Sequence, residues 1–175
     1  MRRRARGRTG WTDDGPGRPA RRAGGGDAAI RLWDPRTGAL LRTFGGPRTS
    51  VASLCLSAGG RYALAGAEYT ARLHLWDVAS GRHVRTVEGP TPWTNDLAFV
   101  AGDRFAVSAH WDGVHVWDVS GGGHLRILDE EDDASCVAAP ADGRFVVAGH
   151  RDGTVRVWEL DWEPSPGVHP GGADI

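Results

Sequence analysis

Hydrophobic and polar residues alternate in short segments along the middle of the chain, and glycine or aspartate separates each segment from the next. Residues 57–66, 100–109 and 140–149 align with one another: each has a turn, then an arginine, then a short apolar run that ends on small residues. Period-two alternation bounded by turn residues predicts β-strands. No segment has a sustained apolar period of 3.6 residues, so we predict an all-β protein.

Tryptophan marks the end of every repeat. Trp33, Trp76 and Trp117 are each followed by aspartate, Trp158 is followed by glutamate, and the intervals between them are 43, 41 and 41 residues. A repeat of about 40–45 residues that closes on Trp-Asp is typical of β-propeller blades. We predict that these four tryptophans are structural and pack between neighbouring blades.

Residues 27–162 resemble the WD40 repeat family of bacterial type, and specifically the C-terminal part of a longer WD40 protein. The resemblance rests on the strands that end at the four tryptophans. It implies a partial WD40-type β-propeller of about three four-stranded antiparallel blades plus a half blade, with strands in residues 29–44, 50–88, 94–128 and 134–159. The family's turn aspartate, about six residues before the tryptophan, is matched by Asp27, Asp112 and Asp152.

One family feature is missing. WD40 repeats often open with a Gly-His pair whose histidine bonds the turn aspartate, but the corresponding residues 45–47, 89–90 and 129–131 contain no histidine. We therefore expect no hydrogen-bonded tetrad, and blades held mainly by apolar packing.

The number of repeats is too small for a closed ring, because a propeller has about four to eight blades. A repeat without its neighbour exposes an apolar flank and an unpaired edge. The chain is therefore either a fragment of a larger propeller whose upstream blades are missing or a module completed by self-association, and we favour the fragment.

Charge divides the chain into three regions. Residues 1–26 carry eight arginines and two aspartates, and residues 27–175 carry thirteen arginines and twenty acids. The first region and residues 163–175 have little apolar content, so we expect both to be disordered around a repeat region at 27–162. All 21 basic residues are arginine, which indicates a GC-rich genome and excludes lysine chemistry. No apolar stretch is long enough to span a membrane, and we expect a cytoplasmic protein.

Candidate contact residues gather on one surface, which we call the upper face. In the family it consists of the loops that open each repeat (residues 45–49, 89–93 and 129–133) and the turns with the aspartates (67–70, 110–113 and 150–153). The candidates are Arg48, Tyr69, Trp93, His110, Trp111, His150 and Arg151. Trp93 and Trp111 lie outside the repeat pattern, so they either shield a seam between blades or contact a partner.

A metal site is conceivable at His110 and His150, each two residues before an aspartate. Duplication of a repeat explains the same pattern, and different blades would separate the two histidines, so we predict no metal and no cofactor.

No catalytic motif is present. We predict a non-catalytic scaffold that binds a protein or peptide. One alternative is a regulatory or sensing segment of a larger enzyme, such as a bacterial protein kinase. A weaker alternative is nucleic-acid binding through the arginine-rich tail, which has only Trp11 as an interleaved aromatic residue.

Overall fold

The structure is a computed structural model that describes residues 29–45, 49–128, 133–140 and 142–160. The predicted disorder of residues 1–26 and 163–175, and the candidates Asp27 and Arg48, lie outside this described part. Within it the chain forms strands and no helix, which confirms the all-β prediction. No helix among the described residues could therefore cross a membrane.

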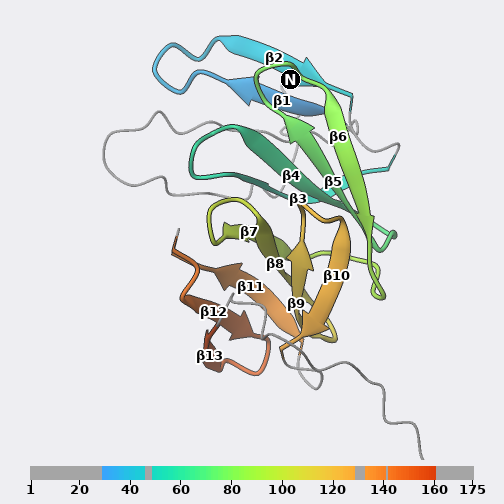
Figure 1. Ribbon diagram of the computed structural model, residues 1–175, viewed down its shortest axis with the longest axis vertical. Helices are drawn as coiled ribbons and strands as arrows, with labels where there is room; N and C mark the ends of the chain where they lie inside the picture. The colour runs from blue at the N-terminus through green and yellow to red at the C-terminus, as the bar shows by residue number, and fades with distance from the viewer. Residues whose placement is uncertain (1–28, 46–48, 129–132, 141, 161–175) are drawn as a thin grey trace, which may run out of the picture.

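Thirteen strands among the described residues form four antiparallel sheets that follow one another in chain order (Figure 1). The first sheet contains β1 (Ile30–Trp33) and β2 (Leu40–Phe44). The second contains β3 (Val51–Leu56), β4 (Tyr62–Ala67), β5 (Arg72–Asp77) and β6 (His83–Glu88). The third contains β7 (Asp96–Val100), β8 (Phe105–His110), β9 (Gly113–Asp118) and β10 (Gly123–Ile127). The fourth contains β11 (Ala134–Ala138), β12 (Phe145–His150) and β13 (Val155–Glu159).

This arrangement is that of a partial propeller, as the sequence predicted, with two complete four-stranded sheets between incomplete ones. Strands β3, β7 and β11 lie next to one another at the inner side, where β3 contacts β7 and β11 contacts both β7 and β8. Asp96 on β7 connects the three inner strands, since its carboxylate accepts hydrogen bonds from Ser53 Oγ (3.4 Å) and from the Val137 amide (3.0 Å). The side-chain amide of Asn95 donates to the Ala134 carbonyl at 2.8 Å.

In the described part of the chain the core consists of three clusters, each between two successive sheets. Alternation along each strand sends every second side chain to the preceding sheet and the others to the following sheet, so both faces of the middle sheets are buried. The tryptophans take part unequally. Trp76 and Trp117 are buried between sheets, Trp158 is partly buried against the third sheet, and Trp33 is 36% exposed.

The aspartate after each tryptophan has a local role. Asp34, Asp77 and Asp118 accept hydrogen bonds from backbone amides two or three residues later, at 2.6–2.8 Å. These bonds stabilise the turn that leads to the last strand of the sheet. Glu159 in the fourth sheet instead pairs with Arg144 at 2.9 Å.

Candidate functional site

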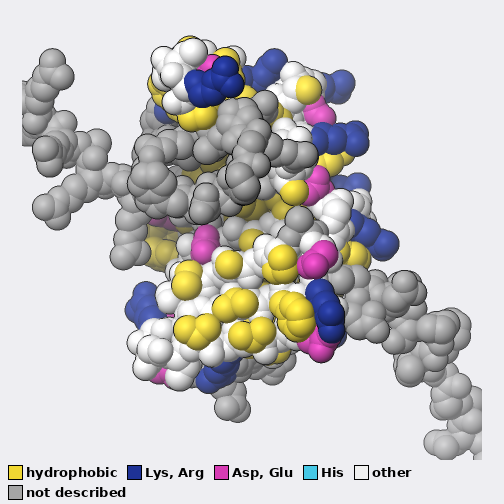
Figure 2. Space-filling model, turned by 90° about the vertical axis from the view of Figure 1, so that its left-hand side faces the viewer, with side chains coloured by type: hydrophobic (Ala, Val, Ile, Leu, Met, Phe, Trp, Pro, Cys, Tyr) yellow, Lys and Arg dark blue, Asp and Glu magenta, His cyan; other side chains and the backbone are white. Residues whose placement is uncertain are grey.

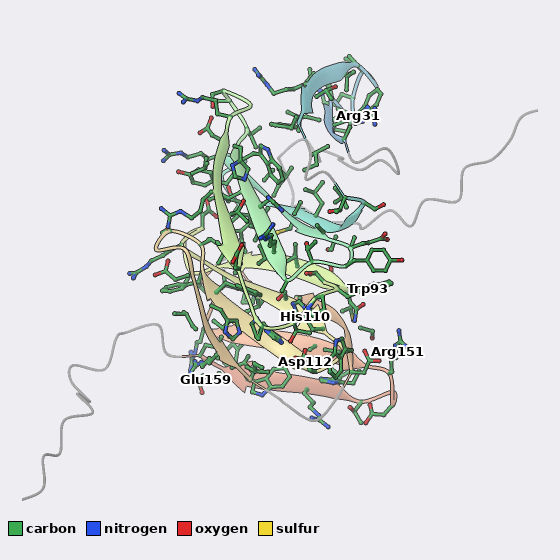
Figure 3. All side chains as sticks on the ribbon, turned by 90° about the vertical axis from the view of Figure 1, so that its right-hand side faces the viewer. Arg31, Trp93, His110, Asp112, Arg151 and Glu159 are labelled. Carbon is green, nitrogen blue, oxygen red and sulfur yellow. The ribbon has the colours of Figure 1, made fainter. Side chains whose placement is uncertain are left out.

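One part of the upper face lies where the second sheet meets the third. The turn between β4 and β5 is anchored where the Glu68 amide donates to the Ser50 carbonyl at 2.9 Å. The loop between β6 and β7 begins where the Gly89 amide donates to the Ala71 carbonyl at 2.8 Å. In Figure 3, Trp93 and Arg151 lie at one edge of the molecule and Glu159 lies at the opposite edge. The two candidates therefore share one side of the sheets.

Tyr69 and Trp93 form an aromatic pair on this surface. Their ring centroids are 4.4 Å apart and their planes are at 70°, an edge-to-face geometry. Tyr69 is 70% exposed and Trp93 is 43% exposed. Both residues have left-handed backbones, with φ of 60° and 74°, a conformation that bulky side chains rarely adopt. Two candidates from separate segments are thus brought into contact and presented to solvent.

The other exposed candidates, Trp111 and Arg151, lie further along the chain. Trp111 is 61% exposed and sits in the turn between β8 and β9. Arg151 pairs with Asp133, with Nε 3.0 Å from Oδ2, and the Arg151 amide donates to the Asp133 carbonyl at 3.0 Å. Asp133 is the one residue of the loop 129–133 within the described residues. Its ion pair and its backbone hydrogen bond with Arg151 stabilise the turn that contains Arg151.

His110 and His150 are buried beneath the upper face. They end β8 and β12 at equivalent positions, with their side chains facing the interior. Asp152, two residues after His150, accepts hydrogen bonds from the Thr154 amide (2.8 Å) and hydroxyl (2.7 Å), which lower the pKa of its carboxyl. In the fourth sheet this aspartate therefore stabilises its own turn.

The third sheet holds a polar network that the sequence analysis did not predict. Thr91, in the loop that opens the repeat, donates through its hydroxyl to Asp112. The second carboxylate oxygen of Asp112 accepts a hydrogen bond from His115 Nε2 at 3.0 Å, and His115 Nδ1 accepts one from His124 Nε2 at 3.1 Å. Thr91 and His115 thus take the place of the absent Gly-His histidine as partners of the turn aspartate. The third sheet therefore has a polar network in addition to the apolar clusters on its two faces.

A second branch of the network lies deeper. Trp117 Nε1 donates to Ser108 Oγ at 2.7 Å, and the Ser108 hydroxyl lies 2.7 Å from His110 Nε2, to which it can donate. All three side chains are buried. His110 Nδ1 makes no well-formed hydrogen bond, although the nearby Pro92 carbonyl favours the protonated ring. The Ser108 hydroxyl is therefore the hydrogen-bond partner of one ring nitrogen in each of two buried side chains, Trp117 and His110.

Burial governs protonation in this network. It lowers the pKa of His110 to about 3, and the neighbouring His115 adds to the shift. Burial likewise lowers the pKa of His115 and of His124. For Asp112, burial raises the pKa, but hydrogen bonds from Thr91 and His115 outweigh it and lower the pKa overall. The histidines are therefore neutral and Asp112 is ionised near neutral pH.

His110, Asp112 and His115 are the described residues that could hold a cation, since their ligand atoms lie within 4.8 Å of one another. The sequence analysis paired His110 with His150 and missed His115. The spacing His-x-Asp-x-x-His was the available signal, because residues on either side of a tight β-turn meet across the hairpin. In the structure Asp112 and His115 bond to each other, and Thr91 and His124 occupy their remaining polar atoms.

Comparison with known proteins agrees with this architecture in one region. The family model described as WD domain, G-beta repeat matches residues 122–159. The match begins at β10 of the third sheet and continues through the three strands of the fourth. No curated protein matches the chain. Residues 122–159 are therefore a WD40 repeat.

Proposed function

We propose that this protein is a non-catalytic scaffold that binds a protein or peptide through its upper face, with the Tyr69–Trp93 pair at the centre of the contact. The observation that carries the proposal is the exposed aromatic pair in a left-handed backbone conformation. The WD40 repeat at residues 122–159 supports this class of function, because repeat architectures of this kind present extended binding surfaces.

Exposure favours a contact role for the pair over shielding of a seam. A tryptophan that seals a seam buries most of its surface, as Trp76 and Trp117 do. Tyr69 and Trp93 leave large parts of their rings in water, and each left-handed residue costs on the order of 1–3 kcal/mol. Backbone strain of this size concentrates at ligand contacts, and tyrosine and tryptophan dominate the energetics of protein interfaces.

Charged and polar residues of this chain lie next to the aromatic pair. Arg72 and Glu88 form an ion pair at 2.8 Å and line a shallow depression with Thr70, whose buried hydroxyl oxygen has no hydrogen-bond partner. We propose that a peptide places an apolar or aromatic side chain against the Tyr69–Trp93 rings and a backbone group near Thr70. We also propose a cytoplasmic location and membership of a larger propeller ring.

The test uses a random peptide library displayed on phage and selected on the immobilised full chain. Selected peptides are then synthesised, and their dissociation constants are measured for the wild type, for Trp93→Ala and for Tyr69→Ala. We expect each change to weaken binding by at least about tenfold, the effect of losing about 1.4 kcal/mol. Leu125→Ala, an exposed apolar change on β10, is the control and should leave binding unaltered. Equal affinity for all four proteins would refute the proposed site.

A further inference from the structure

The four repeats can be compared position by position through the strand that ends in tryptophan. Two apolar residues precede the tryptophan on the face that points to the next sheet. They are Ile30 and Leu32 in β1, Leu73 and Leu75 in β5, Val114 and Val116 in β9, and Val155 and Val157 in β13. The pairing registers agree, since Val107 lies opposite Val116 in the third sheet and Val147 lies opposite Val157 in the fourth.

In the first three sheets these residues are covered by the next sheet, and each is at most 5% exposed. In the fourth sheet Val155 is 68% exposed and Val157 is 61% exposed. Phe145, whose counterpart Phe105 is buried, is also exposed. Figure 2 shows hydrophobic side chains gathered at the level of the fourth sheet. This surface, made by Phe145, Val147, Val155 and Val157, is called the open face.

In the first three sheets, each of these apolar pairs is covered by the repeat tryptophan of the next sheet. Trp76 packs with Ile30 and Leu32, and Trp117 packs with Leu73 and Leu75. Trp158 packs against Val114 and Val116. A sheet face that carries the repeat tryptophan is therefore the complement of an open face.

The chain has one such complementary face with no described sheet in front of it. Trp33 alternates with Ile30 and Leu32 along β1, so it lies on the opposite side of the first sheet, and it is partly exposed where Trp76 and Trp117 are buried. We call this side the Trp33 face. One molecule therefore carries both halves of the interface that it uses three times internally.

We propose that the open face of one molecule binds the Trp33 face of a second copy of this chain, in a head-to-tail contact that continues the propeller. The contact reproduces the packing of Trp76 on Ile30 and Leu32, with Trp33 of one copy on Val155 and Val157 of the other. A heterologous contact of this kind closes into a ring when the rotation between copies allows it. This surface is separate from the Tyr69–Trp93 pair, so peptide binding at the upper face is an independent property.

The experiment is light scattering coupled to size exclusion on the full 18.7 kDa chain, from about 1 µM to about 500 µM, a range suited to micromolar association. We expect a particle of two chains. Val157→Glu and Trp33→Glu should each give monomers, with the circular dichroism of the wild type as the check of folding. A mixture of the two variants should restore the two-chain particle, because each supplies the face that the other lacks.

Each alternative outcome overturns the proposal. A monomeric wild type at every concentration excludes self-association. Association abolished by Val157→Glu and unaffected by Trp33→Glu indicates that two open faces bind each other. The matched control is Leu125→Glu, which places the same charge on an exposed apolar site of β10. If this variant also dissociates, added charge and not the open face determines assembly.

A second measurement needs no variant. Cys136 is exposed on β11 and lies opposite Gly149 in the pairing register, where a Cβ at Gly149 would lie 2.8 Å from its sulfur. Gly149 alternates with Val147 along β12, so the thiol lies on the open face. Its alkylation by iodoacetamide should slow at least tenfold as the protein concentration rises and the face becomes covered. Cys55 is buried and its pKa is raised, so it serves as the unreactive reference. A rate for Cys136 that does not change with concentration contradicts the contact.

Discussion

Replacement of Ser108 by alanine tests whether the buried network stabilises the third sheet. The hydroxyl accepts from Trp117 Nε1 and lies at donor distance from His110 Nε2, both at 2.7 Å, and all three side chains are buried. Ser108→Ala therefore leaves two buried polar groups without a partner. Each such group costs about 1–3 kcal/mol, so we expect the free energy of unfolding to fall by about 2–6 kcal/mol.

The assay is urea unfolding followed by tryptophan fluorescence and circular dichroism, with the m-value compared between variants. Ser57→Ala is the matched control, since Ser57 is also buried but accepts only the Tyr62 amide, at 3.1 Å. A double-mutant cycle with His110→Ala separates the contributions. We expect the double variant to lose less than the sum of the single losses, because His110→Ala removes one of the groups that Ser108→Ala strands.

A small loss would refute this reasoning. If Ser108→Ala costs no more than Ser57→Ala, the two rings must find other partners, and the sheet is held by apolar packing as the sequence analysis expected. Additive losses in the cycle would show that Ser108 and His110 act independently in spite of their contact.

Three further predictions concern stability. His110 has a pKa of about 3 in the folded state against 6.5 for an ordinary histidine, so the stability that its neutral form contributes is complete above pH 6.5 and is lost as the pH falls. Between pH 7.5 and pH 5 the free energy of unfolding should therefore fall by about 2 kcal/mol. His110→Gln removes this titration and should flatten the dependence of the urea midpoint on pH. An unchanged profile in that variant would assign the pH dependence to other groups. Gly89→Ala would place a Cβ in collision with the edge of the Trp117 ring, so thermal unfolding should show a loss of about 1–3 kcal/mol. A Cβ at Gly123 has no neighbour within 4 Å, so Gly123→Ala serves as the control. Equal effects of the two changes would argue against close packing at Gly89. Glu159→Gln breaks an ion pair whose two side chains are 65% and 62% exposed, so the free energy of unfolding from urea titration should change by less than about 0.5 kcal/mol. A larger loss would mean that the pair orders the edge of the fourth sheet.

Local features of the sequence were sufficient for the fold class. Strand positions depend on period-two alternation and turn residues, which act over a few neighbours, and the repeat of tryptophan multiplies this signal four times. The prediction of four-stranded units in residues 50–88 and 94–128 agrees with the second and third sheets. Repetition also carried information about packing, because a position buried in one repeat is buried in the next wherever a neighbouring sheet follows.

The upper face was less accessible to sequence reasoning. The analysis placed the candidate residues in turns, but a turn residue can point to solvent or to the interior, and spacing does not distinguish the two. His110 and Trp111 are adjacent in the chain, and the first is buried while the second is exposed. The contact between Tyr69 and Trp93 joins the turn between β4 and β5 to the loop between β6 and β7. It depends on two left-handed residues, which the side-chain pattern does not indicate.

The sequence by itself determined the strands, their order and the repeated apolar faces, because these follow from short-range geometry and from which residues leave water. Tertiary structure alone decided which polar groups meet. Thr91 donates a hydrogen bond to Asp112, which is 21 residues away in the sequence, and Ser108 accepts one from Trp117 on the neighbouring strand. It also decided that Val155 and Val157 remain in water while Val114 and Val116 do not. The physical reason is that burial and hydrogen bonding depend on the sheet that lies opposite, and equivalent residues differ only in whether such a sheet is present.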